Sequence, residues 1–177
     1  MKQQKLRGVI TAAVIAAAYA ALSLALAPLS FGQIQIRAAE AFTLLPIYSP
    51  YAVWGVTLGC AITNAAGVAT GANFLGIIDV FAGTAASLVS ALLTARLGSS
   101  RLHGLPVAAS LPPVFINALV IGAEWCYVTT GQILTPAFFL YFGLIAAGQF
   151  AACSGLGLLL ISALERTGLH RLLTRLP

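Results

Sequence analysis

The stretch LGIIDVFAGTAASLVSALLTAR, residues 75–96, is apolar over almost its whole length and ends in a basic residue. As an α-helix it would be about 33 Å long, enough to cross the hydrocarbon core of a bilayer, which is about 30 Å thick. Asp79 and Arg96 are its only charged residues. The stretch therefore predicts a membrane-spanning helix with one carboxylate inside it.

The rest of the chain has the same character. Apolar residues make up 60% of the 177 and charged residues only 7%, whereas about a quarter of a soluble domain is charged. So few charges cannot cover a water-facing surface. We therefore expect an all-α membrane protein, a compact bundle that forms a single domain over residues 1–177. The net charge of +5 does not indicate nucleic-acid binding, because the basic residues lie at the ends of apolar runs.

Six apolar runs predict six transmembrane helices. They cover about 9–27, 36–48, 51–67, 75–96, 105–128 and 137–164. The second run is short, about 20 Å as an α-helix, and it contains Arg37, Glu40 and Pro46. Fusing 36–67 into one broken helix would give five spans instead.

The basic residues decide between the two counts. With the N-terminus inside, six spans leave only Arg37 on the outer side, whereas five spans put six basic residues there. The positive-inside rule therefore favours six spans. The basic residues then on the inner side are Lys2, Lys5, Arg7, Arg96, Arg101, Arg166, Arg171 and Arg175.

This topology predicts a multi-pass protein of the cytoplasmic membrane with both termini in the cytoplasm. Residues 1–27 also have the form of a secretory signal. Their apolar stretch, of about 19 residues, is longer than the 7–15 of a signal peptide, so it is kept as the first span.

Ionisable side chains inside spans are costly and indicate function. Glu40, Asp79 and Glu124 each lie about four residues from the outer end of a predicted span, roughly 6 Å below the outer boundary. Asn64 falls at a similar level. Each could be an interfacial residue in contact with water. Their convergence from four spans favours one pocket open to the outside.

The charge balance of this layer indicates what the pocket would bind. Arg37 precedes Glu40 by three residues, so the two are neighbours on a helix and could neutralise each other. Asp79 and Glu124 would remain as surplus negative charge. That surplus suits a cationic ligand or one with several donors.

Other polar and aromatic residues accompany the carboxylates. Asn117 and Gln149 fall nearer the middle of the membrane, where they need hydrogen-bond partners from another helix or from a ligand. Aromatic side chains around the layer would be interfacial anchors or flat faces for stacking on a planar heterocycle. They are Trp125, Tyr127, Tyr51 and Trp54.

Small residues line the first span at steps of three and four. One row consists of Ala12, Ala16, Ala20, Ser23 and Ala27, and a parallel row of Ala13, Ala17 and Ala21. Small residues at this spacing allow another helix to approach closely. Gly55 and Gly59 add a GxxxG in the third span. The rows serve either packing inside the bundle or a partner subunit. Their width favours a partner, at Ala12, Ala16, Ala20 and Ser23.

Nothing in the sequence indicates catalysis or a bound metal or cofactor. His103 and His170 lie in a predicted loop and the tail, without a nearby nucleophile or ligand set. Cys60, Cys126 and Cys153 each lie inside an apolar run and are expected to be small buried side chains. No zinc-protease pair, nucleophile elbow or phosphate-binding loop is present.

Several segments resemble the QueT family in the same order along nearly the whole chain. PLSFGQIQIRAAEAFTLLP, residues 28–46, is similar to that family's first loop and second span and is quite specific. Shorter matches are LGCAITN at 58–64, GIID at 76–79, NALVIGAE at 117–124 and GQ at 148–149.

The resemblance implies a substrate-binding S component of an energy-coupling factor (ECF) importer for queuosine precursors. Such a protein is a six-helix bundle that binds its ligand from outside under the first extracellular loop. It docks through the alanine-rich face of its first helix onto a coupling transmembrane subunit driven by two ATPase subunits, and topples to release the ligand inside. The lack of a Walker-type motif in this chain agrees with ATP hydrolysis by partners.

The ligand implied by the resemblance is a 7-deazaguanine, such as the 7-aminomethyl form, or queuine. Carboxylates such as Glu40, Asp79 and Glu124 can accept its ring N–H, amine and ammonium groups. Its carbonyl oxygen needs a donor. The candidate donors are Asn64, Asn117, Gln149 and Arg37.

Three other functions remain possible from the residues alone. One is a solitary secondary transporter, coupled to protons or sodium, for a vitamin-like or cationic heterocyclic solute. It would use Asp79 or Glu124 as an ion site, although no inverted repeat of broken helices is visible. The others are a membrane enzyme, which lacks a nucleophile or metal set, and a scaffold, which leaves the converging carboxylates unexplained.

Overall fold

A computed structural model describes residues 2–174, which form a bundle of helices. Two of its elements are 3₁₀-helices (η1 and η2) and one is a π-helix (η3). Arg175, counted above among the cytoplasmic basic residues, lies outside the described residues. The elements are α1 (Lys2–Ala25), α2 (Ala27–Ser30), η1 (Ala38–Ile47), α3 (Pro50–Ala69), α4 (Ile77–Leu97), η2 (Val107–Ser110), α5 (Leu111–Thr130), α6 (Pro136–Gln149), η3 (Phe150–Gly157), α7 (Leu158–Thr167) and α8 (His170–Thr174).

Proline and glycine set several helix boundaries. Proline lies in the first turn of α3, α5 and α6, where its missing N–H costs no hydrogen bond. Gly131 and Gly168 end α5 and α7 in the left-handed conformation that glycine adopts most easily. The Ser49 hydroxyl caps α3 by accepting from the Tyr51 N–H at 3.3 Å. Ser49-Pro50 therefore separates η1 from α3, and residues 36–67 do not form one helix.

Five helices of the described residues are long and apolar enough to cross a membrane. The remaining predicted span, 36–48, contains only the ten-residue helix η1. At about 2.0 Å per residue a 3₁₀-helix of this length covers about 20 Å, less than a hydrocarbon core. The all-α membrane class is supported, but the count of six transmembrane helices is not confirmed. The five are Gln3–Ala25, Pro50–Ala69, Ile77–Leu97, Val107–Thr130 and Pro136–Thr167.

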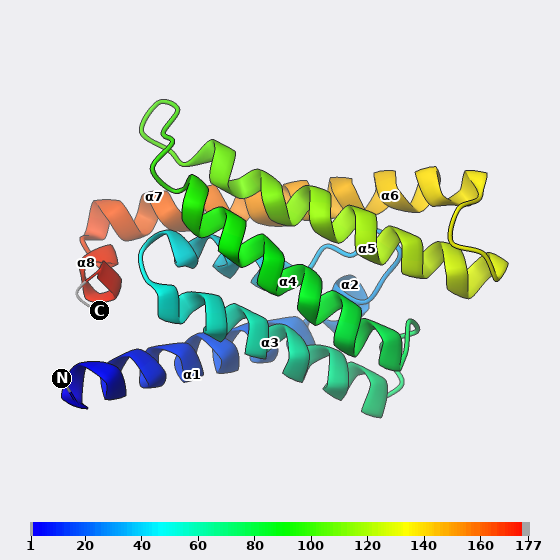
Figure 1. Cartoon of the computed structure of the whole chain (residues 1–177), viewed down its shortest axis with the longest axis horizontal. Helices are drawn as coiled ribbons and strands as arrows, with labels where there is room; N and C mark the ends of the chain where they lie inside the picture. Colours follow the sequence, from blue (N-terminus) through cyan, green and yellow to red (C-terminus); the bar gives the residue numbers. More distant parts are fainter. Residues whose placement is uncertain (1, 175–177) are drawn as a thin grey trace.

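Together with the residues before it, η1 brings the chain back along the bundle from the end of α1 to the start of α3. Helices α1 and α3 run in the same direction, and α8 lies at the same end as the start of α1 (Figure 1). The return between α1 and α3 consists of α2, the irregular residues 31–37 and η1. Irregular backbone at membrane depth is tolerated where protein covers it. Here η3 supplies cover: Gly157 packs against Leu44 of η1, and the Cys153 thiol donates to the Glu40 carbonyl oxygen at 3.7 Å.

The first row of small residues on α1 packs inside the molecule. Its members Ala12, Ala16, Ala20 and Ser23 are 7, 4, 7 and 0% exposed. A Cβ on Gly55 or Gly59 of α3 would collide with Ile15 or Tyr19 of α1. The close crossing of these two helices accounts for both motifs. The expectation that this row faces a partner is therefore corrected, and the exposed row on α1 is Ala13, Ala17 and Ala21.

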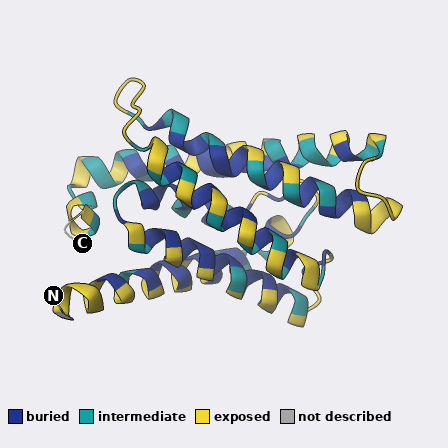
Figure 2. Cartoon of the chain, in the orientation of Figure 1, coloured by how far each residue is buried: buried dark blue, intermediate teal, exposed yellow. Residues whose placement is uncertain are grey.

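The outer surface of the bundle is largely apolar. Exposed residues cover the outside of the long helices, and buried residues face the centre (Figure 2). The exposed residues include Phe81 and Phe139, which are 72 and 74% exposed, as expected of side chains in contact with lipid.

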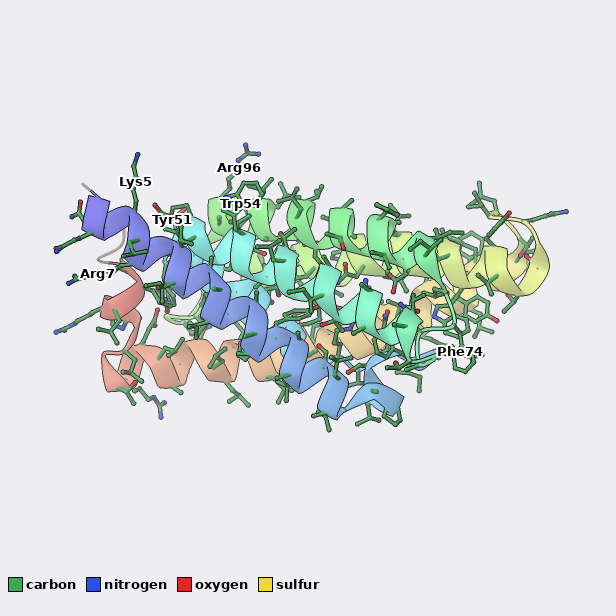
Figure 3. The ribbon with its side chains drawn as sticks, turned by 90° about the horizontal axis from the view of Figure 1, so that it is seen from below. Lys5, Arg7, Tyr51, Trp54, Phe74 and Arg96 are labelled. Carbon is green, nitrogen blue, oxygen red and sulfur yellow. The ribbon has the colours of Figure 1, made fainter. Side chains whose placement is uncertain are left out.

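Contrary to the prediction from the sequence, Tyr51 and Trp54 do not surround the carboxylates. They lie near the end of the bundle that carries Lys5 and Arg7, whereas Phe74 marks the other end (Figure 3). They are therefore not part of the layer of carboxylates.

One ion pair joins elements at the end where the termini lie. The Glu165 carboxylate of α7 accepts hydrogen bonds from the Tyr48 hydroxyl at 2.6 Å and from Arg101 Nη1 at 2.8 Å. The side chains of Arg101 and Glu165 are 34 and 29% exposed, so we expect the pair to add little stability.

Candidate functional site

The irregular residues 31–37 carry two polar side chains into the centre of the bundle. Gln35 has a φ of 48° and is 3% exposed, as is Arg37. The Ile34 and Gln35 carbonyl oxygens lie against Gly148 of α6, where a Cβ would collide with them. Glycine at 148 therefore allows the segment to pass close to α6 and to bring Arg37 inside.

Arg37 is a buried cation with few partners. Its Nη1 donates to the Cys60 sulfur at 3.7 Å, and its guanidinium lies 5.2 Å from the centre of the Phe31 ring, within the range of a cation–π interaction. Its Nε and Nη2 have no hydrogen-bond partner among the described residues. Buried donors left unpaired are costly, so these two groups are available to a ligand.

Glu40 lies at the start of η1 and is 2% exposed. Its Oε1 accepts a hydrogen bond from the Tyr19 hydroxyl at 2.6 Å, while its Oε2 has no partner among the described residues. The neutralisation expected between Arg37 and Glu40 is not seen as an ion pair within 4.0 Å. The helix begins only at Ala38, with Arg37 in an extended conformation before it, so the two side chains do not stand on one helical face.

Asp79 and Asn64 lie together between α3 and α4. Asn64 Nδ2 donates to the Asp79 carbonyl oxygen at 2.9 Å, and Asn73 Nδ2 donates to Asp79 Oδ2 at 2.7 Å. Asp79 Oδ1 and Asn64 Oδ1 remain unpaired among the described residues. A Cβ on Gly83 would collide with Asp79 Oδ1 and approach Asn64 Nδ2. The two polar groups therefore lie directly against Gly83.

Asn117 and Gln149 meet across α5 and α6. Asn117 Nδ2 donates to Gln149 Oε1 at 3.1 Å, and the Cys153 thiol donates to the same oxygen at 3.5 Å. This is the helix-to-helix bond that intramembrane amides usually make. The pair nevertheless also borders the space around Arg37 and Glu40.

These groups enclose a small central cavity with a volume of about 10 Å³, about the least that holds one water molecule. Four of the predicted residues line it, and Asn64 and Asp79 adjoin it through Gly83. Gln35, Ser87, Tyr19 and Asn73 were not predicted. Unpaired donors and acceptors lie side by side here, an arrangement that can bind the edge of a planar ligand once the surrounding segments move apart to admit it. The lining is Gln35, Arg37, Glu40, Cys60, Gly83, Ser87, Asn117, Ile121 and Gln149.

Three of the four residues predicted to form one layer lie near the outer ends of their helices. Asp79 is the third residue of α4, and Asn64 and Glu124 precede the ends of α3 and α5 by five and six residues. Asn117 lies thirteen residues before the end of α5 at Thr130, about 20 Å along the helix, and it borders the same cavity as Glu40. Glu124 lies about 9 Å from that end and does not line the central cavity. The central cavity therefore lies deeper than the layer of Asn64, Asp79 and Glu124, at the level expected for Asn117 and Gln149.

Glu124 and Trp125 belong to a different part of the bundle. Glu124 lines an apolar groove between α4 and α5. Trp125 stacks on Tyr141, with ring centres 5.9 Å apart and planes at 22°, inside an apolar cluster with Leu75 and Ile121. Leu75 of this cluster lines the groove and Ile121 lines the central cavity, whereas neither Glu124 nor Trp125 lines the cavity with Arg37 and Glu40.

Among the described residues, the histidines and cysteines form no metal-binding site. Within residues 2–174, no three His, Cys, Asp or Glu side chains are placed to hold one metal ion. His103 is exposed in the loop between α4 and η2, and His170 packs on Tyr48 with ring centres 5.7 Å apart. Cys60, Cys126 and Cys153 are buried free thiols.

Comparison with known proteins gives a family match over most of the chain. The family model described as QueT transporter matches residues 9–166. No curated protein and no solved structure matches the chain.

Proposed function

The chain belongs to the QueT transporter family, and from this premise we propose that it is the substrate-binding S component of an ECF-type importer. It captures a queuosine precursor outside the cell and delivers it inward with partner subunits that hydrolyse ATP. Family membership implies a transport role rather than catalysis.

The observation that carries this proposal is the set of unpaired groups around the central cavity. Acceptors remain on Glu40 Oε2, Asp79 Oδ1 and Asn64 Oδ1, and donors on Arg37 Nε and Nη2. Native proteins pair nearly all buried polar atoms, so a cluster of exceptions in one place supports a ligand site.

The chemistry of a 7-deazaguanine complements these groups. Its ring N–H and exocyclic amine are adjacent donors that one carboxylate, Glu40 or Asp79, can accept together. Its carbonyl oxygen accepts from the Arg37 guanidinium. The 7-aminomethyl form adds an ammonium, for which the second carboxylate is the acceptor. Asn117 and Gln149 exchange their mutual hydrogen bond for contacts to the ring.

The partners are a coupling transmembrane subunit and two ATPase subunits. The exposed alanine row on α1, Ala13, Ala17 and Ala21, is the docking face, because small residues let another helix approach closely. Both termini face the cytoplasm, since the basic residues gather at that end of the bundle.

Uptake by reconstituted protein tests the proposal. Purified chain is placed in proteoliposomes alone or with the coupling subunit and both ATPases, and accumulation of labelled 7-aminomethyl-7-deazaguanine is followed. We expect uptake only with the partners and ATP. Uptake by the chain alone, driven by a proton or sodium gradient, would contradict the proposal and favour a secondary transporter.

A further inference from the structure

A second, larger cavity lies at the end of the bundle away from the termini. It is an apolar groove of about 620 Å³, lined by the first turns of α4, the second half of α5 and the loop that leads to α6. Figure 1 shows the positions of these three segments. Its volume falls within the 300–1,000 Å³ of small-molecule sites. Residues of its wall include Ile78, Ala82, Leu119, Val128, Leu134 and Phe138.

Glu124 is the single charged residue in this wall. It is 8% exposed, and both of its carboxylate oxygens are buried without a hydrogen-bond donor among the described residues. No Lys, Arg or His lines the groove. The charge of Glu124 also interacts with that of Asp79, a second buried carboxylate, and such groups cost several kcal/mol unless a cation, a donor or a proton compensates them. A cation bound in the groove would therefore compensate this negative charge.

The groove is distinct from the central cavity. The two linings share no residue, although the charge of Glu124 interacts with that of Asp79 beside the central cavity. A ligand of the groove is thus recognised by its own chemistry, and this inference goes beyond the proposed importer function.

We propose that the groove binds a compound with a primary ammonium group on an apolar body, with the Glu124 carboxylate as the counter-ion. The apolar wall takes the body of the ligand, and the ammonium supplies the missing donors as a charge-assisted hydrogen bond. The amine comes either from water or from a lipid headgroup such as that of phosphatidylethanolamine, because both carry the same group.

Calorimetric titration of the full-length protein in detergent with tryptamine and tryptophol tests the site. The two probes share one ring system, and the second replaces the ammonium by a hydroxyl. We expect tryptamine to bind at least about tenfold more tightly, and Glu124→Gln to abolish this preference. Ala82→Phe fills the groove and should weaken both probes. Glu165→Gln removes the same charge at the far end and should leave both affinities unchanged.

The outcomes are decisive in either direction. Equal affinities of the two probes, no binding of tryptamine, or tryptamine affinity unaffected by both Glu124→Gln and Ala82→Phe would overturn the proposal. If Glu124→Gln does not fold, the probe preference and the Ala82→Phe variant still decide it. In nanodiscs, loss of tryptamine binding when phosphatidylethanolamine replaces phosphatidylcholine supports the site with a lipid as its natural occupant, and unchanged binding supports it with a water-borne amine.

Discussion

At the scale of single residues, Tyr19 positions the Glu40 carboxylate. It is fully buried and donates to Oε1 at 2.6 Å. Tyr19→Phe removes this donor and leaves both oxygens of a buried carboxylate unpaired. We expect the free energy of unfolding in detergent to fall by about 1–3 kcal/mol, with weaker ligand binding because Glu40 is no longer held. Thermal or denaturant unfolding followed by fluorescence measures the first effect.

Tyr51→Phe is the matched control for this change. The Tyr51 ring packs against Gly8, and the hydroxyl makes no hydrogen bond within the described part of the chain. Its loss should leave stability and affinity within error of the unmodified protein. Equal effects of the two substitutions would show that the bond to Glu40 adds nothing.

Some site residues could be predicted from the sequence because a charge in a span is rare. Arg37, Glu40 and Asp79 were identified in this way, and the structure buries all three. Tyr19 and Asn73 were missed for physical reasons. A tyrosine on an apolar span has the composition of a core residue, and Asn73 lies outside any apolar run. Only the folded chain brings each within hydrogen-bond distance of a carboxylate.

At the scale of elements, the passage of residues 31–37 past α6 depends on Gly148. Gly148→Ala introduces a Cβ that collides with the Ile34 carbonyl oxygen, so the segment must shift and displace Arg37. We expect ligand affinity to fall at least about tenfold, because a buried charge-assisted bond is worth about 1.5–3 kcal/mol. Calorimetric titration measures the loss.

Gly143 of the same helix provides the control, since a Cβ there has no neighbour within 4 Å. Gly143→Ala should leave affinity unchanged. If both substitutions left the ligand equally well bound, the close approach at Gly148 would have no bearing on the site.

The two alanine rows of α1 should respond differently to a bulky side chain. Ala16 is 4% exposed against α3, so Ala16→Leu overpacks the bundle and should lower its stability by about 1–3 kcal/mol. Ala17 is exposed, so Ala17→Leu should leave folding and ligand binding intact and block ATP-driven uptake by the assembled importer. Normal uptake by Ala17→Leu protein would remove this row from the partner interface.

Residues 36–48 show why predicting membrane-spanning helices from hydropathy was incomplete. An apolar run reports that a segment avoids water, and it does not distinguish an α-helix from a 3₁₀-helix. Residues 36–48 were assigned to a full span on their composition and on charge parity. Pro46 cannot donate within a helix, and the cover from η3 and Gly148 that stabilises this irregular segment comes from about a hundred residues later in the chain.

At the scale of the whole molecule, we expect the two ends of the bundle to face opposite sides of the membrane. Ser99 lies in the loop at the end with the termini and Gln132 in the loop at the other end, and both are exposed (Figure 1). In intact cells a membrane-impermeant maleimide should label Gln132→Cys and should label Ser99→Cys only after permeabilisation. Labelling of Ser99→Cys alone in intact cells would reverse the orientation.

We propose that the buried carboxylates around the cavity bind a deazaguanine. Calorimetric titration of folded protein with 7-aminomethyl-7-deazaguanine tests it most directly, with Asp79→Asn as the variant and Glu165→Gln as the control. We predict saturable binding to the unmodified protein and to Glu165→Gln. Asp79→Asn should bind about ten- to more than a hundredfold more weakly, because an amide presents only one acceptor to a two-donor edge and loses about 1.5–3 kcal/mol. Absence of binding to the unmodified protein, or equal affinity in Asp79→Asn, would contradict the claim.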